Sequence, residues 1–352
     1  MVKYLFGLLL IFGACTTYDL ESEELILRPR ILAVRVDPPE ARIGQTVRLT
    51  PLIATPVGFA GTIDSSWLDC QEEGALKGGD SRDWCEDRDA EALLSRSDEL
   101  VYKIPEDLPK EEVQSLSFTA GYWKRLTLEI RDRLGGEQDR AFKRLVVQPP
   151  ARDPNDLQEM MIFEAMRNHN PDLPELEVYS LDAAGLESPL PAGASLLADS
   201  DYLFRLAIDK RHRQDYKVVT LDLSGIDPTQ AQNLSPEEMR ERVSIEDRRE
   251  LLVIRYYRSE GKFGRDQRPN RTVESTSEEP QYYPAEITWA LNTGDREVSL
   301  PGEIKLWFVV ADGRGGMDWV NFTRAFEKGS AKPRLAALSP EPPPSLRKEP
   351  AP

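Results

Sequence analysis

The side chains able to perform chemistry are few, and their spacing matches no catalytic or zinc-binding motif. The chain of 352 residues contains two histidines, His169 and His212, and three cysteines. Two His and three Cys cannot build a zinc cluster of ordinary spacing. The sequence contains no Gly-x-Ser-x-Gly elbow, no His-Glu-x-x-His motif and no phosphate-cradling glycine loop. We therefore expect a protein that is not an enzyme and that needs no metal and no cofactor.

Carboxylates are abundant, but they do not single out an acid–base pair. The chain has 61 Asp and Glu against 45 Lys and Arg, which gives a formal net charge of −16. With this many acids, close pairs arise by chance, so a hydrolase built on two carboxylates is only an alternative. The negative charge repels phosphate backbones, which argues against nucleic acid as a partner. Because 40% of the residues are hydrophobic, the chain can bury a core.

The N-terminus contains the parts of an export signal. Lys3 precedes an uncharged run over residues 4–14, which is too short to span the hydrocarbon core of a membrane. Two small residues, Gly13 and Ala14, end the run and are followed directly by Cys15. An ordinary secretory signal that happens to contain a cysteine is one interpretation of this pattern.

The stretch Ile11–Cys15 resembles the lipobox of bacterial lipoproteins, with Phe12 where leucine is more usual. This resemblance implies that residues 1–14 are a signal peptide and that Cys15 receives a lipid, which anchors the chain to a membrane. Thr16 follows the cysteine, whereas an Asp there is the inner-membrane retention signal of enteric bacteria. The resemblance therefore implies localisation at the outer membrane, with more than one acyl chain for stable anchoring.

Alternation of apolar and polar residues, interrupted by Pro and Gly, predicts β-strands along most of the chain. Leu126, Leu128 and Ile130 alternate with polar residues, a turn follows, and residues 141–147 return as a hairpin. A second hairpin follows the strand that ends at Val310. The sequence therefore favours an all-β protein.

The two hairpins share a sequence pattern. Its Asp is Asp132 in the first hairpin and Asp312 in the second, 180 residues later. In each, an apolar residue is followed by one residue, an Asp, two further residues and a pair of glycines. We interpret this as the internal duplication of one β-sandwich module. An Asp before a glycine pair most often caps its own turn, and we expect this role rather than calcium binding. The predicted turn residues are Asp132, Gly135, Gly136, Asp312, Gly315 and Gly316.

The order of these motifs resembles PKD-like and immunoglobulin-like modules of bacterial surface proteins. The matching pieces are a strand with a Pro-rich turn over residues 37–40, the pattern Gly44-x-x-Val-x-Leu, and the closing hairpin. Gly261-Lys-Phe263 also resembles a segment of such modules. Over residues 1–330 the chain is similar to lipoproteins of myxobacteria and related groups. The resemblance implies two immunoglobulin-like or PKD-like β-sandwich domains in tandem with minor short helices, and no fixed activity.

The predicted organisation has six segments. They are residues 1–14 (signal peptide), 15–30 (acidic tether), 31–150 (first module), 151–172 (linker), 173–330 (second module) and 331–352 (disordered Pro-rich tail). A short helix is expected over Asp156–Asn168. Another is expected over Met239–Val243, after a capping box that begins at Ser235.

Cys70 and Cys85 lie in one insertion of the first module. In an exported protein we expect them to form a disulfide, which would close a loop of about 15 residues and contribute about 3 kcal/mol. A free thiol pair or a metal site is the alternative. Residues 64–91 contain ten acidic and three basic residues. Since no Asp-x-Asp-x-Asp-Gly spacing occurs, we expect a solvated acidic loop rather than a calcium site.

These features favour a non-enzymatic lipoprotein of the outer membrane that serves as an interaction or assembly component of the cell envelope, with an envelope protein or glycan as partner. One alternative is a polysaccharide- or protein-binding surface module, in which aromatic side chains stack on a glycan. Candidates for stacking are Tyr282, Tyr283, Trp307 and Trp319, although the two tryptophans are more readily explained as covering a hairpin or joining the core. A second alternative is an envelope hydrolase.

Overall fold

The computed structural model describes residues 24–70, 91–107, 122–148, 167–209, 212–221, 243–264, 270–273, 282–291 and 302–327. These residues form twenty strands and no α-helix, which confirms the all-β prediction. No helix among them is long and apolar enough to span a membrane. The helices predicted over Asp156–Asn168 and Met239–Val243 fall outside the described residues, except at their C-terminal ends, which are not helical.

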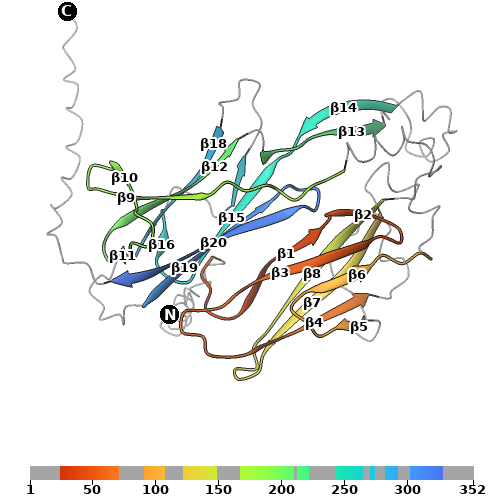
Figure 1. Cartoon of the computed structure of the whole chain (residues 1–352), viewed down its shortest axis with the longest axis horizontal. Helices are drawn as coiled ribbons and strands as arrows, with labels where there is room; N and C mark the ends of the chain where they lie inside the picture. Colours follow the sequence, from red (N-terminus) through yellow and green to blue (C-terminus); the bar gives the residue numbers. More distant parts are fainter. Residues whose placement is uncertain are drawn as a thin grey trace, which may run out of the picture.

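The strands divide into two modules that lie against each other (Figure 1). In module 1, one sheet has the order β1 (Arg30–Asp37), β3 (Thr46–Ala54), β6 (Leu100–Lys103). The other has the order β2 (Glu40–Arg42), β8 (Gln138–Gln148), β7 (Tyr122–Asp132), β4 (Ile63–Cys70), β5 (Glu91–Ser95). Neighbouring strands are antiparallel except β2 and β8, which are parallel.

Module 2 repeats this plan. Its first sheet has the order β10 (Glu187–Pro189), β9 (Leu176–Leu181), β12 (Asp201–Asp209), β18 (Tyr282–Ala290), β16 (Lys262–Phe263). Its second has the order β11 (Leu196–Leu197), β20 (Met317–Glu327), β19 (Glu303–Ala311), β15 (Leu252–Arg258), β17 (Asn270–Val273). A separate hairpin of β13 (Asp215–Leu221) and β14 (Val243–Arg249) is inserted between β12 and β15.

The two modules match strand by strand. The order β2-β8-β7-β4-β5 corresponds to β11-β20-β19-β15-β17, and β1-β3-β6 corresponds to β9-β12-β18. In both modules the short strand β2 or β11 pairs in parallel with the last strand. Two facing sheets connected in this way form an immunoglobulin-like sandwich. The shared topology supports the internal duplication inferred from the two hairpins.

Each sandwich is held by its own apolar core. In module 1, the side chain of Trp67 is fully buried among residues from both sheets. In module 2 the core is aromatic: the rings of Phe204 and Phe322 meet edge to face with centroids 5.0 Å apart, and those of Tyr256 and Phe308 lie 5.7 Å apart. Alternating strand residues supply these side chains because successive residues point to opposite faces of a sheet.

A third apolar cluster joins the modules. Strand β19 departs from alternation: Trp307 and Val309 point away from the core of module 2, yet only 6% and 2% of their surface is exposed. They pack against the outer face of β1 and β3, where Leu52 and Ala54 lie. A strand that is apolar on both sides is usually buried on both sides. The complete cluster contains Ile26, Leu32, Ala33, Leu52, Ala54, Trp307 and Val309, with Tyr257, Met317 and Trp319 packed against it.

The end of the predicted tether over residues 15–30 belongs to the folded body. The backbone N–H of Ile26 donates to the carbonyl oxygen of Arg258 (2.9 Å), and the N–H of Arg258 donates to that of Glu24 (2.9 Å). Ile26 is 1% exposed because its side chain lies in the cluster between the modules. The part of the tether that the structure describes is therefore not a free spacer, which corrects the prediction for residues 24–30.

Truncation of the inter-module contact should destabilise the protein. Trp307→Ala removes a buried indole and should lower the free energy of unfolding by about 3–5 kcal/mol, measured by urea denaturation followed by circular dichroism. Leu134→Ala is the control, because Leu134 is 79% exposed at a hairpin tip and its truncation should change stability by about 0.5 kcal/mol or less. Equal effects of the two substitutions would contradict the role assigned to Trp307.

Candidate functional site

The two aspartates of the duplicated hairpins hold their own turns. The carboxylate of Asp132 accepts hydrogen bonds from the backbone N–H groups of Leu134 (3.0 Å) and Gly135 (2.9 Å). One oxygen of Asp312 accepts from the N–H groups of three residues: Arg314 (2.7 Å), Gly315 (3.0 Å) and Gly316 (2.9 Å). A Cβ at position 316 would lie 2.1 Å from the other carboxylate oxygen of Asp312, so this turn requires glycine there.

The two turns differ in their surroundings. The turn at Asp132 is exposed at one end of module 1, whereas the turn at Asp312 is inserted between the modules. The carbonyl oxygen of Gly315, in module 2, accepts a hydrogen bond from the ammonium group of Lys143, in module 1 (2.9 Å). The same local motif therefore caps a free hairpin in one module and a docked hairpin in the other.

Two asparagines of the predicted linker connect the modules. The backbone N–H of Asn168 donates to Glu40 of module 1 (3.2 Å), and its side-chain amide donates to Asp312 of module 2 (2.8 Å). The side chain of Asn170 donates to the carbonyl oxygen of Val36 (2.7 Å) and accepts from the N–H of Met317 (2.9 Å). The end of the linker is thus hydrogen-bonded to both modules.

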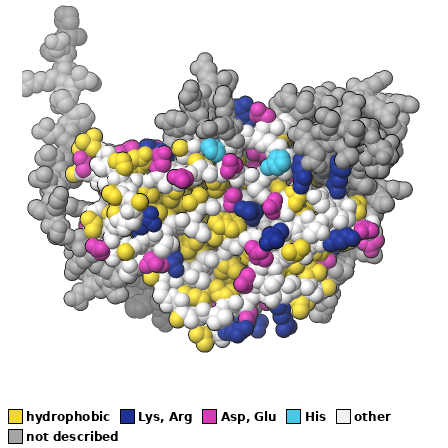
Figure 2. Space-filling view, in the orientation of Figure 1, with side chains coloured by type: hydrophobic (Ala, Val, Ile, Leu, Met, Phe, Trp, Pro, Cys, Tyr) yellow, Lys and Arg dark blue, Asp and Glu magenta, His cyan; other side chains and the backbone are white. Residues whose placement is uncertain are grey.

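Charged side chains are buried where these contacts meet. Arg314 forms ion pairs with Glu40 (3.2 Å) and Glu250 (3.5 Å), and its guanidinium lies 4.3 Å from the ring centroid of Tyr216. We call this group the junction cluster; its members are Glu40, Lys143, Asn168, Arg213, Glu250, Asp312 and Arg314. Figure 2 shows side chains of both charges interspersed on one face of the molecule.

Burial shifts the titration of the junction cluster. It raises the pKa values of Glu40 and Asp312, and it raises the pKa of Glu250 to about 7. Burial also lowers the pKa of the Lys143 ammonium to about 8. Perturbed pKa values are common at catalytic sites, but structural ion-pair networks produce them as well. Here the carboxylates are held by hydrogen bonds or ion pairs at the junction, so we interpret the cluster as structural.

A cavity of about 390 Å³ opens beside the junction cluster. Its walls include three prolines, the exposed side chain of His169, and Arg35, which forms an ion pair with Asp318 across the modules (3.2 Å). The exposed imidazole of His169 shares this cavity with Asp37, Asp172 and Asp318. No group of three or more His, Cys, Asp or Glu in the described part of the chain is placed to hold a metal ion.

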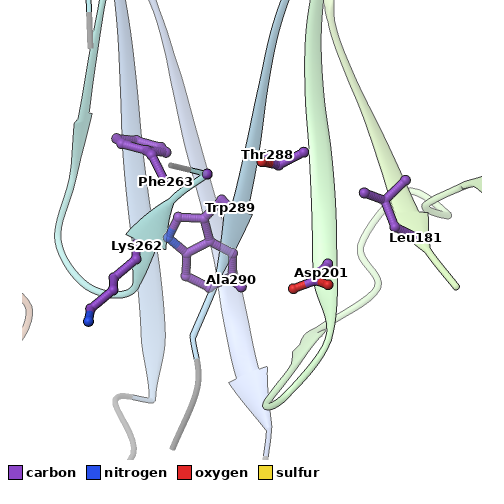
Figure 3. A pocket seen from close by; sticks show the side chains of 8 residues that line it. Leu181, Asp201, Lys262, Phe263, Thr288, Trp289 and Ala290 are labelled. Atoms are coloured by element: carbon purple, nitrogen blue, oxygen red, sulfur yellow. The ribbon is translucent and has the colours of Figure 1, made fainter. Parts of the chain in front are cut away.

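A second cavity, of about 410 Å³, lies on module 2 at one end of the sheet β10-β9-β12-β18-β16 (Figure 3). The strand register places Leu181, Asp201, Ala290 and Lys262 in one row across four strands. Residues two apart share a sheet face, so Tyr179, Leu203 and Thr288 form the next row on the same side. We call this cavity the sheet-face groove; Lys262 and Phe263 lie on one side of it and Leu181 on the other.

Glycines set the shape of the sheet-face groove. A Cβ at Gly264 would lie 2.1 Å from the hydroxyl oxygen of Thr288, so this position must remain without a side chain for the hydroxyl to keep its place. Gly261 has a φ of +80° and approaches the indole of Trp289, where a Cβ would lie 2.5 Å away. The motif Gly261-Lys-Phe263 thus brings β16 close to β18, and β16 forms one wall of the groove.

An ion-pair network fixes the face next to the groove. Arg205 on β12 forms ion pairs with Glu286 on β18 (2.5 Å) and Glu187 on β10 (3.1 Å). Its guanidinium also lies 4.9 Å from the ring centroid of Tyr179 on β9. Four adjacent strands are therefore tied together on their outer side, which holds the groove in a defined shape.

Two of the four aromatic side chains selected from the sequence pack inside the folded body, as was the more ready explanation for them. Trp307 and Trp319 belong to the contact between the modules. The side chains of Tyr282 and Tyr283 lie outside the described residues, as do Cys15 and Cys85, so the predicted lipidation and the predicted Cys70–Cys85 disulfide remain predictions. Sequence reasoning missed the groove because its residues come from four strands and share no local motif; only the strand register brings them together.

No protein-family model matches the chain, and no curated protein matches it. Similar solved structures include carbohydrate-binding modules from the β-sandwich superfamily (10% identity, TM-score 0.22, covering 84% of this chain and 94% of that chain). Another is dimeric latent PorU from Porphyromonas gingivalis (10% identity, TM-score 0.21, covering 87% of this chain and 24% of that chain). A third consists of three N-terminal domains of the bacteriophage RB49 outer capsid protein Hoc (8% identity, TM-score 0.20, covering 84% of this chain and 98% of that chain). TM-scores this low carry no argument, so the fold assignment rests on the strand order.

The junction cluster should make stability depend on pH. In the unfolded chain Glu250 titrates near 4.5, whereas in the folded protein its pKa is about 7. The folded state therefore binds more protons between these values, and the free energy of unfolding should fall as pH rises through them. Glu250→Gln should reduce this slope by up to about 1.4 kcal/mol per pH unit, measured by urea denaturation from pH 4.5 to 7.5.

Some slope of the same sign should remain in Glu250→Gln, because burial also raises the pKa values of Glu40 and Asp312. The control is Glu303→Gln, since Glu303 pairs with Lys305 on β19 and its side chain is 46% exposed. This control should keep the wild-type slope. A Glu250→Gln variant with an unchanged slope would show that Glu250 is not the titrating group.

Proposed function

We propose that this protein is a non-enzymatic lipoprotein of the bacterial outer membrane that presents a body of two joined modules to a partner in the cell envelope. The observation that carries the proposal is the junction. The apolar cluster around Trp307 and the two linker asparagines join the modules into one body. The carboxylates with raised pKa values, Glu40, Glu250 and Asp312, serve this connection, and neither cavity described above is lined by them.

Joined modules suit a binding role. Recognition of a partner is favoured when its binding surface is already in position, because less conformational entropy is lost on association. Perturbed acids that are engaged with arginine, asparagine and backbone N–H groups are not available to transfer protons to a substrate. The arrangement therefore favours binding over hydrolysis, which was the alternative suggested by the many carboxylates.

Support for the membrane anchor comes from the stretch Ile11–Cys15 and from the contact that Glu24 makes with module 2. Glu24 already contacts β15 of module 2. Nine residues after a lipidated Cys15, a fully extended chain reaches at most about 32 Å. In the proposal, the body is therefore held close to the membrane surface by a short connection.

Labelling of the cysteine tests the anchor. Cells that express the full chain are grown with radiolabelled palmitate, and we expect label in the wild-type protein and recovery in the membrane fraction. Cys15→Ser should abolish both, because a single thiol accepts the lipid. Cys70→Ser is the matched control and should retain both. An unlabelled wild-type chain, or equal labelling of Cys15→Ser, would overturn the proposed anchor.

A further inference from the structure

We infer that the sheet-face groove of module 2 binds a neutral carbohydrate chain. The inference rests on the proposed function as a binding protein and names the class of its ligand. The groove crosses β9, β12, β18 and β16, and its volume of about 410 Å³ falls within the size range of small-ligand sites.

The two central strands under the groove, β12 and β18, have no backbone groups to offer a peptide strand. β12 pairs with both β9 and β18, and β18 pairs with both β12 and β16. An extended peptide that adds to a sheet needs an edge strand with unpaired N–H and C=O groups. Any ligand lying across these central strands must therefore be recognised by side chains.

The side chains in the groove match the chemistry of sugar hydroxyls. The carboxylate of Asp201 accepts hydrogen bonds, and the ammonium of Lys262 donates them. Asp201 and Lys262 are both exposed and lie in the same row across the sheet. Their charges cancel, which disfavours a polyanion or a polycation and favours an uncharged ligand that both donates and accepts hydrogen bonds.

Apolar groups line the groove beside these polar ones. Leu181 forms one side and Ala290 lies in the same row, whereas the ring of Phe263 packs against the core of module 2 on the opposite face of the sheet. The faces of sugar rings carry C–H groups, which pack against aliphatic and aromatic side chains, while their edges carry the hydroxyls. A groove that combines apolar side chains with a few polar groups has this same division.

The equivalent sheet face of module 1 shows why this one is available. In module 1 the outer face of β1 and β3 carries Ala33, Leu52 and Ala54, and module 2 covers it. In module 2 the corresponding strands, β9 and β12, carry Tyr179, Asp201 and Arg205 on that face. This sheet face is therefore an apolar contact surface in module 1, whereas in module 2 it is polar and accessible at the groove.

Affinity electrophoresis tests the inference. The full-length chain, purified from membranes in detergent, is run through native gels that contain barley mixed-linkage β-glucan, xylan, galactomannan or, as a polyanion, alginate. We expect retardation by at least one of the three neutral polymers. Retardation by none of them, or by alginate alone, would overturn the inference.

Variants of the groove test its location. Gly264→Ala fills the space beside Thr288, and the double variant Asp201→Asn, Lys262→Met removes both charges from the row. Each should raise the apparent Kd for the neutral polymer by about tenfold or more. Gly302→Ala is the matched control, because a Cβ there meets nothing within 4 Å, and it should bind like the wild type. Unchanged binding in both groove variants would overturn the assignment.

Two readouts separate this inference from the proposed function. A chain that is labelled by palmitate but retarded by no neutral polymer would overturn the carbohydrate groove and leave the anchor intact. A chain that binds a neutral polymer but carries no label would do the reverse. The far-ultraviolet circular dichroism spectrum and the unfolding midpoint of each variant show whether the variant is folded, and the double variant changes only exposed side chains.

Discussion

The contact between two outer sheet faces determines most of the other features of the molecule. Trp307 and Val309 of module 2 cover Leu52 and Ala54 of module 1, and burial of this apolar surface favours the joined state. Once the faces meet, the turn at Asp312 is placed against module 1, together with the linker residues. Charges brought into this region lose water, so each requires a protein partner. The hydrogen bonds and ion pairs of the junction cluster supply those partners.

Duplication gave two modules with one topology, and divergence gave their faces different chemistry. On β7, Thr127 and Glu129 occupy the positions that correspond to Trp307 and Val309 on β19, as the hairpin alignment shows. The outer face of β19 therefore became a contact surface, whereas the outer face of β7 is polar. The first sheets diverged in the opposite direction: that of module 1 is covered, and that of module 2 bears the groove. Function in such a fold depends on these surface differences rather than on the strand order.

Local features of the structure followed from the sequence. The alternation over residues 126–130 predicted a strand with one buried face, and Asp132 and Asp312 were expected to cap their turns because an Asp carboxylate reaches the N–H groups of the next few residues. Other features could not be predicted in this way. The sequence favoured a role for Trp307 in covering a hairpin or joining the core, but it did not show which surface would contact it. The tether was expected to stay free because nothing in residues 24–30 specifies their pairing with β15.

By itself, the sequence determined the all-β class, the duplication, the two capped hairpins and the composition that argues against zinc and nucleic acid, because these depend on residue types and on spacing within a few positions. Only the tertiary structure decided which faces meet, where Glu250 is buried, and that Asp201, Thr288 and Lys262 share one groove. These properties depend on strand register and on contacts between residues about 60 to 250 positions apart. The physical reason is that burial, and with it the pKa values and the availability of each side chain, is set by the assembled surfaces and not by any local segment.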